Sequence, residues 1–248
     1  MKWLRKTYVA IVMAFLYAPI LVLIVFSFNK SKSRGAWTGF TLSWYQRLFT
    51  NEAIIQSLIN TLVVALISSV LATVIGTLAA IGIRNMGRLS RSVVMNVTYM
   101  PVINPEIVTG VSLMLLFVFV KNAGVQLEFG FVTLVLAHIT FNIPYVILNV
   151  MPKLRQMDVS VYEAAQDLGC SPMQAFFKVV IPEIMPGILA GFLMAVTYSL
   201  DDFIISYFVT GPTSQTLPIT IFSMTRRKVS PEINAPSTII FVVVLIVL

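Results

Sequence analysis

Three acidic residues lie inside long apolar segments of this 248-residue sequence, at Glu106, Asp201 and Asp202. A carboxylate near the centre of a membrane-spanning helix costs about 2.5–3.5 kcal/mol, so such residues usually face a cavity or a partner. Two interpretations of the adjacent aspartates are open. They attract a cationic solute, or they make hydrogen bonds at a helix end or between subunits. Nearby aromatic rings could add cation–π contacts to a bound cation; these are Tyr198, Phe203 and Tyr207.

Glu106 has a second explanation in its local sequence. Asn104, Pro105 and Glu106 match the N-cap, N1 and N2 positions of a helix, where a carboxylate complements the helix dipole. The alternative is a charge near the inner mouth of a transport pathway. Both interpretations stay open at this stage.

His138 is the only histidine. It stands among apolar residues, and no Cys, His or carboxylate has metal-site spacing from it, so an interhelical hydrogen bond is favoured over a metal ligand. A single His within a membrane span is a poor general base, which disfavours a hydrolase. The sequence also has no G-x4-G-K-[ST] motif, so it has no P-loop for nucleotide phosphates. We therefore expect no enzyme activity and no cofactor in this chain.

The composition indicates the elements that position these residues. Hydrophobic residues make up 58% of the chain and charged residues 11%, against about 25% charged in ordinary soluble domains. Mean hydropathy is +0.90. The net charge of +7 would suggest nucleic acid in a soluble protein. Here the basic residues stand between apolar runs, so lipid headgroups explain them better. The single cysteine, Cys170, excludes an internal disulfide and a Cys-based zinc site.

Six apolar segments are candidates for membrane-spanning helices, each needing about 20 residues to cross the hydrocarbon core. They are residues 8–28, 58–83, a third that begins after 93 and ends at 120, 131–151, 187–209, and 236–248. We expect the third to be broken by Pro101 and Pro105. The last segment is too short to span, so we expect further residues after Leu248. The sequence thus predicts an all-α membrane protein with a single domain over residues 1–248.

Two ridges of small residues are suited to close helix packing. They are Gly187-x3-Gly191-x3-Ala195 and Ala72-x3-Gly76-x3-Ala80. The sequence leaves open whether they pack within the chain or against a partner. Lys and Arg are divided almost evenly between the two sides of the membrane, so the positive-inside rule does not orient the chain.

Residues 152–186 are the most polar stretch and carry two capping-box patterns, at 160–163 and 171–174. These predict a helix over 161–168 and a second over 173–180 that ends before Pro182. Gly169 stands where a left-handed C-terminal cap belongs. Apolar residues on this loop are expected to be exposed: Ala164, Ala165, Phe176 and Phe177. They either dock into a groove on another protein or pack on the chain's own helix ends.

The same loop resembles a known family. Glu163-Ala164-Ala165, Gly169, then Val179, Ile181 and Pro182 are similar to the EAA loop, E-A-A-x3-G-x9-I-x-L-P, of permeases of bacterial binding-protein-dependent ABC importers. Val and Ile replace the Ile and Leu of the pattern. The resemblance implies a type I (maltose-importer-like) permease whose cytoplasmic coupling loop, 152–186, seats in an ATPase subunit. The residues it implicates are Glu163, Ala164, Ala165, Gly169, Phe176, Phe177 and Pro182.

Further segments resemble the second (C) permease subunit of spermidine/putrescine importers. They are residues 37–45, 199–203, 211–212, 216–218 and 230–235. This resemblance implies that Asp201, Asp202, Glu106 and the aromatic residues Tyr198, Phe203 and Tyr207 belong to a polyamine pathway. Another small solute is the alternative substrate.

The resemblance also implies the assembly. The expected partners are a second permease in a heterodimer, two ATPase subunits that bind ATP and Mg, an extracytoplasmic binding protein and membrane lipid, without nucleic acid. The expected location is the bacterial inner membrane, with several spans and a cytoplasmic N-terminus. The rival class is a stand-alone secondary transporter or channel. Many such transporters have internal repeats, and none is evident in this sequence.

Overall fold

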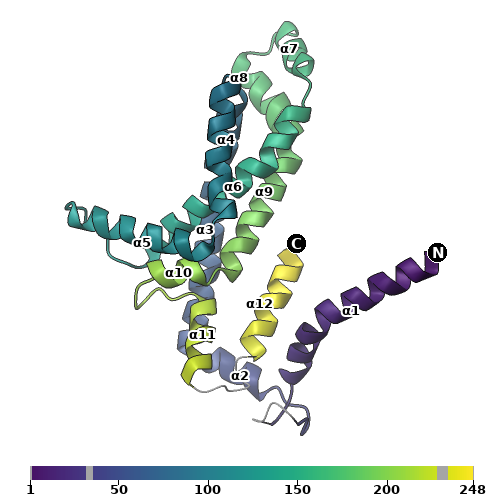
Figure 1. Cartoon of the computed structure of the whole chain (residues 1–248), viewed down its shortest axis with the longest axis vertical. Coiled ribbons are helices and arrows are strands. Elements are labelled where there is room, and N and C mark those ends of the chain that lie inside the picture. The colour runs from purple at the N-terminus through teal and green to yellow at the C-terminus, as the bar shows by residue number, and fades with distance from the viewer. Residues whose placement is uncertain (1, 32–35, 228–233, 248) are drawn as a thin grey trace. The chain divides into compact units, whose positions relative to one another are not determined.

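The computed structural model describes residues 2–31, 36–227 and 234–247. Every regular element in these ranges is a helix, and one isolated antiparallel bridge joins Asn29 to Phe40. The all-α prediction is confirmed. The elements are α1 (Lys2–Phe26), α2 (Ser43–Thr50), α3 (Glu52–Arg84), α4 (Arg88–Ile103), α5 (Glu106–Asn122), α6 (Phe131–Gln156), α7 (Val159–Asp167), α8 (Pro172–Ala175), the π-helical segment η1 (Phe176–Val180), α9 (Ile181–Asp201), α10 (Ile204–Val209), α11 (Leu217–Arg227) and α12 (Asn234–Val247) (Figure 1).

The long apolar helices fall where the sequence predicts membrane spans. Among the described residues, four helical stretches are long and apolar enough to cross a membrane: α1, α3, α6 and the run Pro172–Asp201. The pair α4 and α5 makes a fifth, bent by 105°. The shorter α12 lies where the sixth span is expected.

The break in the third span lies at Pro105, one of the two prolines expected to break it. Pro101 is inside α4, and the chain leaves the helix at Asn104, which has extended backbone angles (φ −69°, ψ 144°). The ring of Pro105 disfavours a helical conformation at the residue before it. Asn104 therefore ends α4 and does not cap α5, whose N-cap is Pro105. The predicted capping role of Asn104 is wrong.

The chain divides into two compact units, Met1–Leu58 with Leu217–Leu248, and Ile59–Thr216. The first unit has a small core of Trp44, Leu48, Ile54, Leu217 and Ala235. The Trp44 indole donates a 2.8 Å hydrogen bond to the Asn29 carbonyl, which ties α2 to the segment after α1. The prediction of one membrane domain over the whole chain stays a prediction.

The second unit is built around α6, which lies beside α9 and α4 (Figure 1). The small-residue ridges meet at Val146 of α6. A Cβ added at Gly76 would lie 2.8 Å from Val146 Cβ, and one added at Gly191 would lie 3.1 Å from Val146 Cα. Both ridges therefore pack within the chain, against the same valine. This close packing holds α3, α6 and α9 together.

The predicted fifth span, 187–209, is two helices. The helical run begins earlier, at Pro172, and continues through Pro182, so the predicted end of a helix before Pro182 is wrong. The π-helical turn lets Ile181 donate to the Phe176 carbonyl five residues back, directly before Pro182, which has no N–H to donate. The run then ends at Asp201, and α10 starts at Ile204.

Candidate functional site

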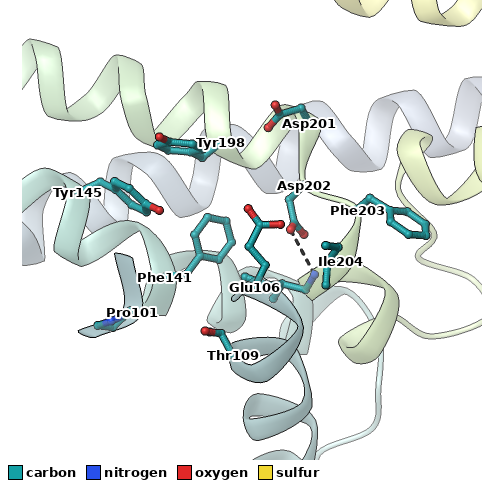
Figure 2. Close-up of a pocket in the computed structure, with 11 residues that line it drawn as sticks. Pro101, Glu106, Thr109, Phe141, Tyr145, Tyr198, Asp201, Asp202, Phe203 and Ile204 are labelled. Atoms are coloured by element: carbon teal, nitrogen blue, oxygen red, sulfur yellow. Dashed lines mark hydrogen bonds between the residues drawn. The ribbon is translucent and has the colours of Figure 1, made fainter. Parts of the chain in front are cut away.

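A pocket of about 340 Å³ lies at the break between α9 and α10 (Figure 2). It collects residues from five helices and from the break between α9 and α10. The lining residues are Pro101 of α4, Glu106 and Thr109 of α5, Phe141 and Tyr145 of α6, Tyr198 and Asp201 of α9, Asp202 and Phe203 of the break, and Ile204 and Ile205 of α10. Five of the six pathway residues predicted from the sequence are thus brought together.

Two carboxylates of the pocket are exposed, and they come from different helices. Glu106 stands in the first turn of α5, and Asp201 is the last residue of α9. Figure 2 shows the Glu106 side chain reaching into the pocket between Phe141 and Asp202, with Asp201 at the rim on the side of Tyr198. Among the lining residues that the structure describes, none is Lys, Arg or His. The pocket is therefore strongly acidic.

Asp202 differs from its neighbour because it is buried, with 9% of its surface exposed. Its carboxylate accepts the backbone N–H of Ile205 at 3.2 Å and that of Ser206 at 2.7 Å. These are donors of the first turn of α10, which have no partner within their own helix. Asp202 therefore caps α10, which is the helix-end hydrogen bond that the sequence left open as one interpretation.

Aromatic rings form one wall of the pocket. The rings of Tyr145 and Tyr198 lie 4.4 Å apart between centroids, at 34°. Tyr145, Phe141 and Thr109 are pocket residues that sequence reasoning missed, and no spacing rule connects them to residues 198–203. Tyr207 was predicted to join the pathway, but it lies outside the lining of the pocket. It is half exposed and contacts the rings of Phe203 and Phe208.

His138 makes the interhelical hydrogen bond that the sequence favoured. Its Nε2 lies 3.0 Å from Ser206 Oγ and 3.6 Å from Asp202 Oδ2, and the imidazole is fully buried. This contact links α6 to the start of α10, directly behind the pocket.

The polar loop between α6 and α9 is a second candidate site. Its first helix, α7, begins two residues earlier than predicted, because Asp158 is the N-cap and accepts the Ser160 N–H at 2.9 Å. The predicted capping box of Ser160 and Glu163 is therefore wrong. This N–H bond holds the pKa of the Asp158 carboxyl below its usual value. The second capping box, Ser171 with Gln174, is confirmed.

Gly169 ends α7 in the left-handed conformation that the sequence predicts, with φ +89°. Its N–H donates to the Gln166 carbonyl at 2.9 Å, and the Cys170 N–H donates to the Ala165 carbonyl at 3.1 Å. These two bonds form a Schellman motif. The motif turns the chain from α7 into α8.

The apolar residues of the loop divide into an exposed and a packed group. Phe177 is 61% exposed, and Glu163, Ala164, Gly169 and Pro182 are also exposed. Ala165 and Phe176 are partly buried, and Phe176 packs with Tyr162 against the core of the second unit. The expectation that Ala165 and Phe176 are exposed is therefore wrong, and the alternative of packing on the chain's own helices holds for Phe176. Sequence reasoning missed two further exposed residues, Leu168 and Met173, at 87% and 67%.

Fold and sites together define a helical protein with membrane-spanning helices and an acidic pocket. Residues 72–248 match the family described as the binding-protein-dependent transport system inner membrane component. The chain belongs to this family, and it is a permease component of a binding-protein-dependent importer. The putrescine transport system permease protein PotI of Escherichia coli (strain K12) is 42% identical over 229 residues, 91% of this chain and 81% of PotI. The spermidine/putrescine transport system permease protein PotC of the same strain is 38% identical over 245 residues, 99% of this chain and 91% of PotC.

Solved structures show the same fold. One chain of a bacterial ABC transporter that imports the acidic polysaccharide alginate matches with a TM-score of 0.76 and 17% identity, covering 99% of this chain and 92% of that chain. A chain of an amino acid ABC transporter with histidines matches with a TM-score of 0.58 and 22% identity, over 84% and 95% of the two chains. Family membership favours an importer component over the rival class of a stand-alone secondary transporter.

Proposed function

We propose that this chain is a permease subunit of an ATP-driven importer of polyamines, and that its acidic, aromatic pocket lies on the translocation pathway. Polyamines carry several ammonium groups joined by apolar methylene chains. Carboxylates complement the ammonium groups, and tyrosine faces attract cations and cover methylenes. The observation that carries the proposal is the convergence of Glu106 and Asp201 on one pocket beside the Tyr145–Tyr198 pair.

The relatives support the polyamine class, since PotI and PotC are transport permeases for putrescine and for spermidine and putrescine. The pocket also argues against an anion. Two exposed carboxylates in a partly apolar site repel a negatively charged solute and attract a cation. This separates the chain in chemistry from the alginate importer whose fold it shares.

The second part of the proposal concerns energy coupling. The exposed face of the loop, with Ala164, Leu168 and Phe177, is the surface that an ATPase subunit would contact. Its partners would be a second permease, two ATPase subunits that bind ATP and Mg, and an extracytoplasmic binding protein. With the loop in the cytoplasm, the N-terminus is cytoplasmic as well, and the chain spans the bacterial inner membrane several times.

α9 would connect the two sites mechanically. It has 21 residues and is therefore about 30 Å long at 1.5 Å per residue. The loop precedes its first turn, and Asp201 is its last residue. A movement of the loop would thus reach the pocket through one rigid helix that is packed along α6, as in hinge or rigid-body switching.

The experiment is uptake of labelled putrescine and spermidine by the assembled transporter in proteoliposomes with its binding protein. Glu106→Gln and Asp201→Asn each remove one pocket charge. Glu128→Gln is the matched control, because Glu128 is exposed and pairs with Lys121 outside the pocket. A charged hydrogen bond is worth about 1.5–3 kcal/mol, so each pocket variant should lower uptake by about tenfold or more while the control transports normally. Normal uptake in both pocket variants and in the double variant would remove this pocket from the pathway.

A further inference from the structure

The break between α9 and α10 is fixed by polar contacts to α6. At the start of α10, Ser206 Oγ lies 3.0 Å from His138 Nε2. At the end of α10, Thr133 Oγ1 donates to the Val209 carbonyl at 2.7 Å. Both partners on α6 are fully buried. A short helix of six residues is thus held at both ends by one neighbouring helix.

These contacts are costly to break because they lie in the buried interior of the second unit. In an apolar interior, a polar group that loses its partner has no water to replace it, so the cost of breaking the contact is large. The His138 Nε2 faces two acceptors, Ser206 Oγ and Asp202 Oδ2, and we assign the ring proton to that nitrogen. The other ring nitrogen, Nδ1, has no hydrogen-bond partner among the described residues, so the ring's orientation rests on the contacts at Nε2.

Close packing against α5 also fixes the position of α10. A Cβ added at Gly110 of α5 would lie 2.8 Å from the Phe208 ring and 3.3 Å from Ile205 Cα, so α10 lies directly on α5. His138 lies on α6, the helix that packs closely against Gly76 and Gly191 at Val146. The contact from His138 therefore joins the break to the central helix of the second unit.

We propose that His138 is a positioning residue for the pocket. By bonding Ser206 and facing Asp202, it sets the end of α9 and the start of α10, and so holds the Asp201 carboxylate at the rim. His138 is absent from the pocket lining, so it acts on the solute only through these residues. The transport readout of this proposal rests on the proposed polyamine function; the chemical readout below does not.

The chemical test measures where residue 201 lies. In a background with Cys170→Ala, which removes the only cysteine, Asp201→Cys is the reporter in the assembled transporter. Its rate of reaction with a water-soluble thiol reagent is measured with His138→Leu, His138→Gln and Ser206→Ala. Gln places a donor close to the Nε2 position. Thr140→Val is the matched control on α6, because the exposed Thr140 hydroxyl bonds the Leu136 carbonyl of its own helix at 2.7 Å and no other described residue.

His138→Leu and Ser206→Ala should each change the rate by about tenfold, the effect of losing a buried polar contact. His138→Gln should restore it to within about twofold, and Thr140→Val should leave it unchanged. Equal rates in all variants would overturn the proposal, and so would a Gln variant as altered as the Leu variant. If His138→Leu does not assemble, Ser206→Ala and His138→Gln still decide the result.

The transport test uses a double-mutant cycle. If His138 acts through Asp201, His138→Leu lowers putrescine uptake in the natural sequence but adds little in the Asp201→Asn background. A purely structural role for His138 would lower uptake by the same factor in both backgrounds, and that result overturns the proposal. Normal uptake in Asp201→Asn, in Glu106→Gln and in the double variant refutes the proposed function instead, and the thiol rates then decide the role of His138 alone.

Discussion

Gly169 gives the sharpest test of the loop, because its environment separates backbone conformation from bulk. Its φ is +89°, and a Cβ added to it would meet nothing within 4 Å. A larger side chain therefore fits in space, and the whole cost comes from the left-handed backbone. For residues with a Cβ this conformation costs roughly 1–2 kcal/mol, more for a β-branched side chain. One to two kcal/mol corresponds to a factor of about 5–30 in a conformational equilibrium.

Gly169→Val should thus shift the loop away from the Schellman turn and lower affinity for the ATPase subunit by about 5–30-fold. Gly169→Asn should have a smaller effect, because Asn adopts the left-handed conformation more readily. Gly87→Val is the matched control: its Cβ also meets nothing within 4 Å, but Gly87 has an ordinary φ of −59°. The assay is binding of the purified ATPase subunit to the permease complex in nanodiscs.

Equal binding by the Val and Asn variants, or equal loss in the Gly87 control, would refute the argument from backbone conformation. Full binding together with full uptake in Gly169→Val would also refute the coupling role of this turn. Because the space around Gly169 is open, the expected loss is restricted to residues that resist a positive φ.

Three further predictions concern packing, the helix cap and the exposed face of the loop. Gly191→Leu should overpack the contact with Val146 and destabilise the complex by about 1–3 kcal/mol, seen as a lower Tm; an unchanged Tm contradicts the close approach. The Asp158 cap should be at full strength above the ordinary Asp pKa of about 3.9 and weaken as pH falls through its lowered pKa, because the folded state favours the ionised form. Amide exchange of Ser160, corrected for its intrinsic rate, should show this protection lost at low pH in the natural protein and no such dependence in Asp158→Asn. Phe177→Ala should leave Tm unchanged but weaken ATPase-subunit binding by about tenfold or more if this exposed ring is an interface anchor; normal binding would exclude it from the interface.

The apolar segments gave reliable positions for the long helices because length and hydropathy are local properties. α6 begins at Phe131, as predicted, and continues beyond the predicted end at 151 to Gln156. Gly169 and the Ser171 cap were also predictable, since each depends on residues within one turn. Ser160 was assigned the cap that Asp158 makes, because two good capping residues stand two positions apart and the local pattern does not choose between them.

The pocket was only partly predictable. Hydropathy continues through residues 203–209, so nothing in the apolar pattern indicates that α9 ends at Asp201. The break is capped by Asp202, which accepts the N–H groups of Ile205 and Ser206 three and four residues later. That signal is local, but the apolar residues on both sides of it favoured one continuous span. Tyr145 joins Tyr198 only because α6 and α9 lie side by side. Tyr207 is close in sequence to Asp202 but lies on α10, outside the pocket.

The measurement closest to the central claim is the charge preference of the pocket itself. With Cys170→Ala and Tyr198→Cys in the assembled transporter, the rates of a cationic and an anionic methanethiosulfonate reagent are compared. We predict faster reaction of the cationic reagent, slowing of that reaction by putrescine, and loss of the preference in the Glu106→Gln/Asp201→Asn double variant. Equal rates for the two reagents, or a preference that survives the double variant and ignores putrescine, would contradict a cation-binding pocket at the α9–α10 break.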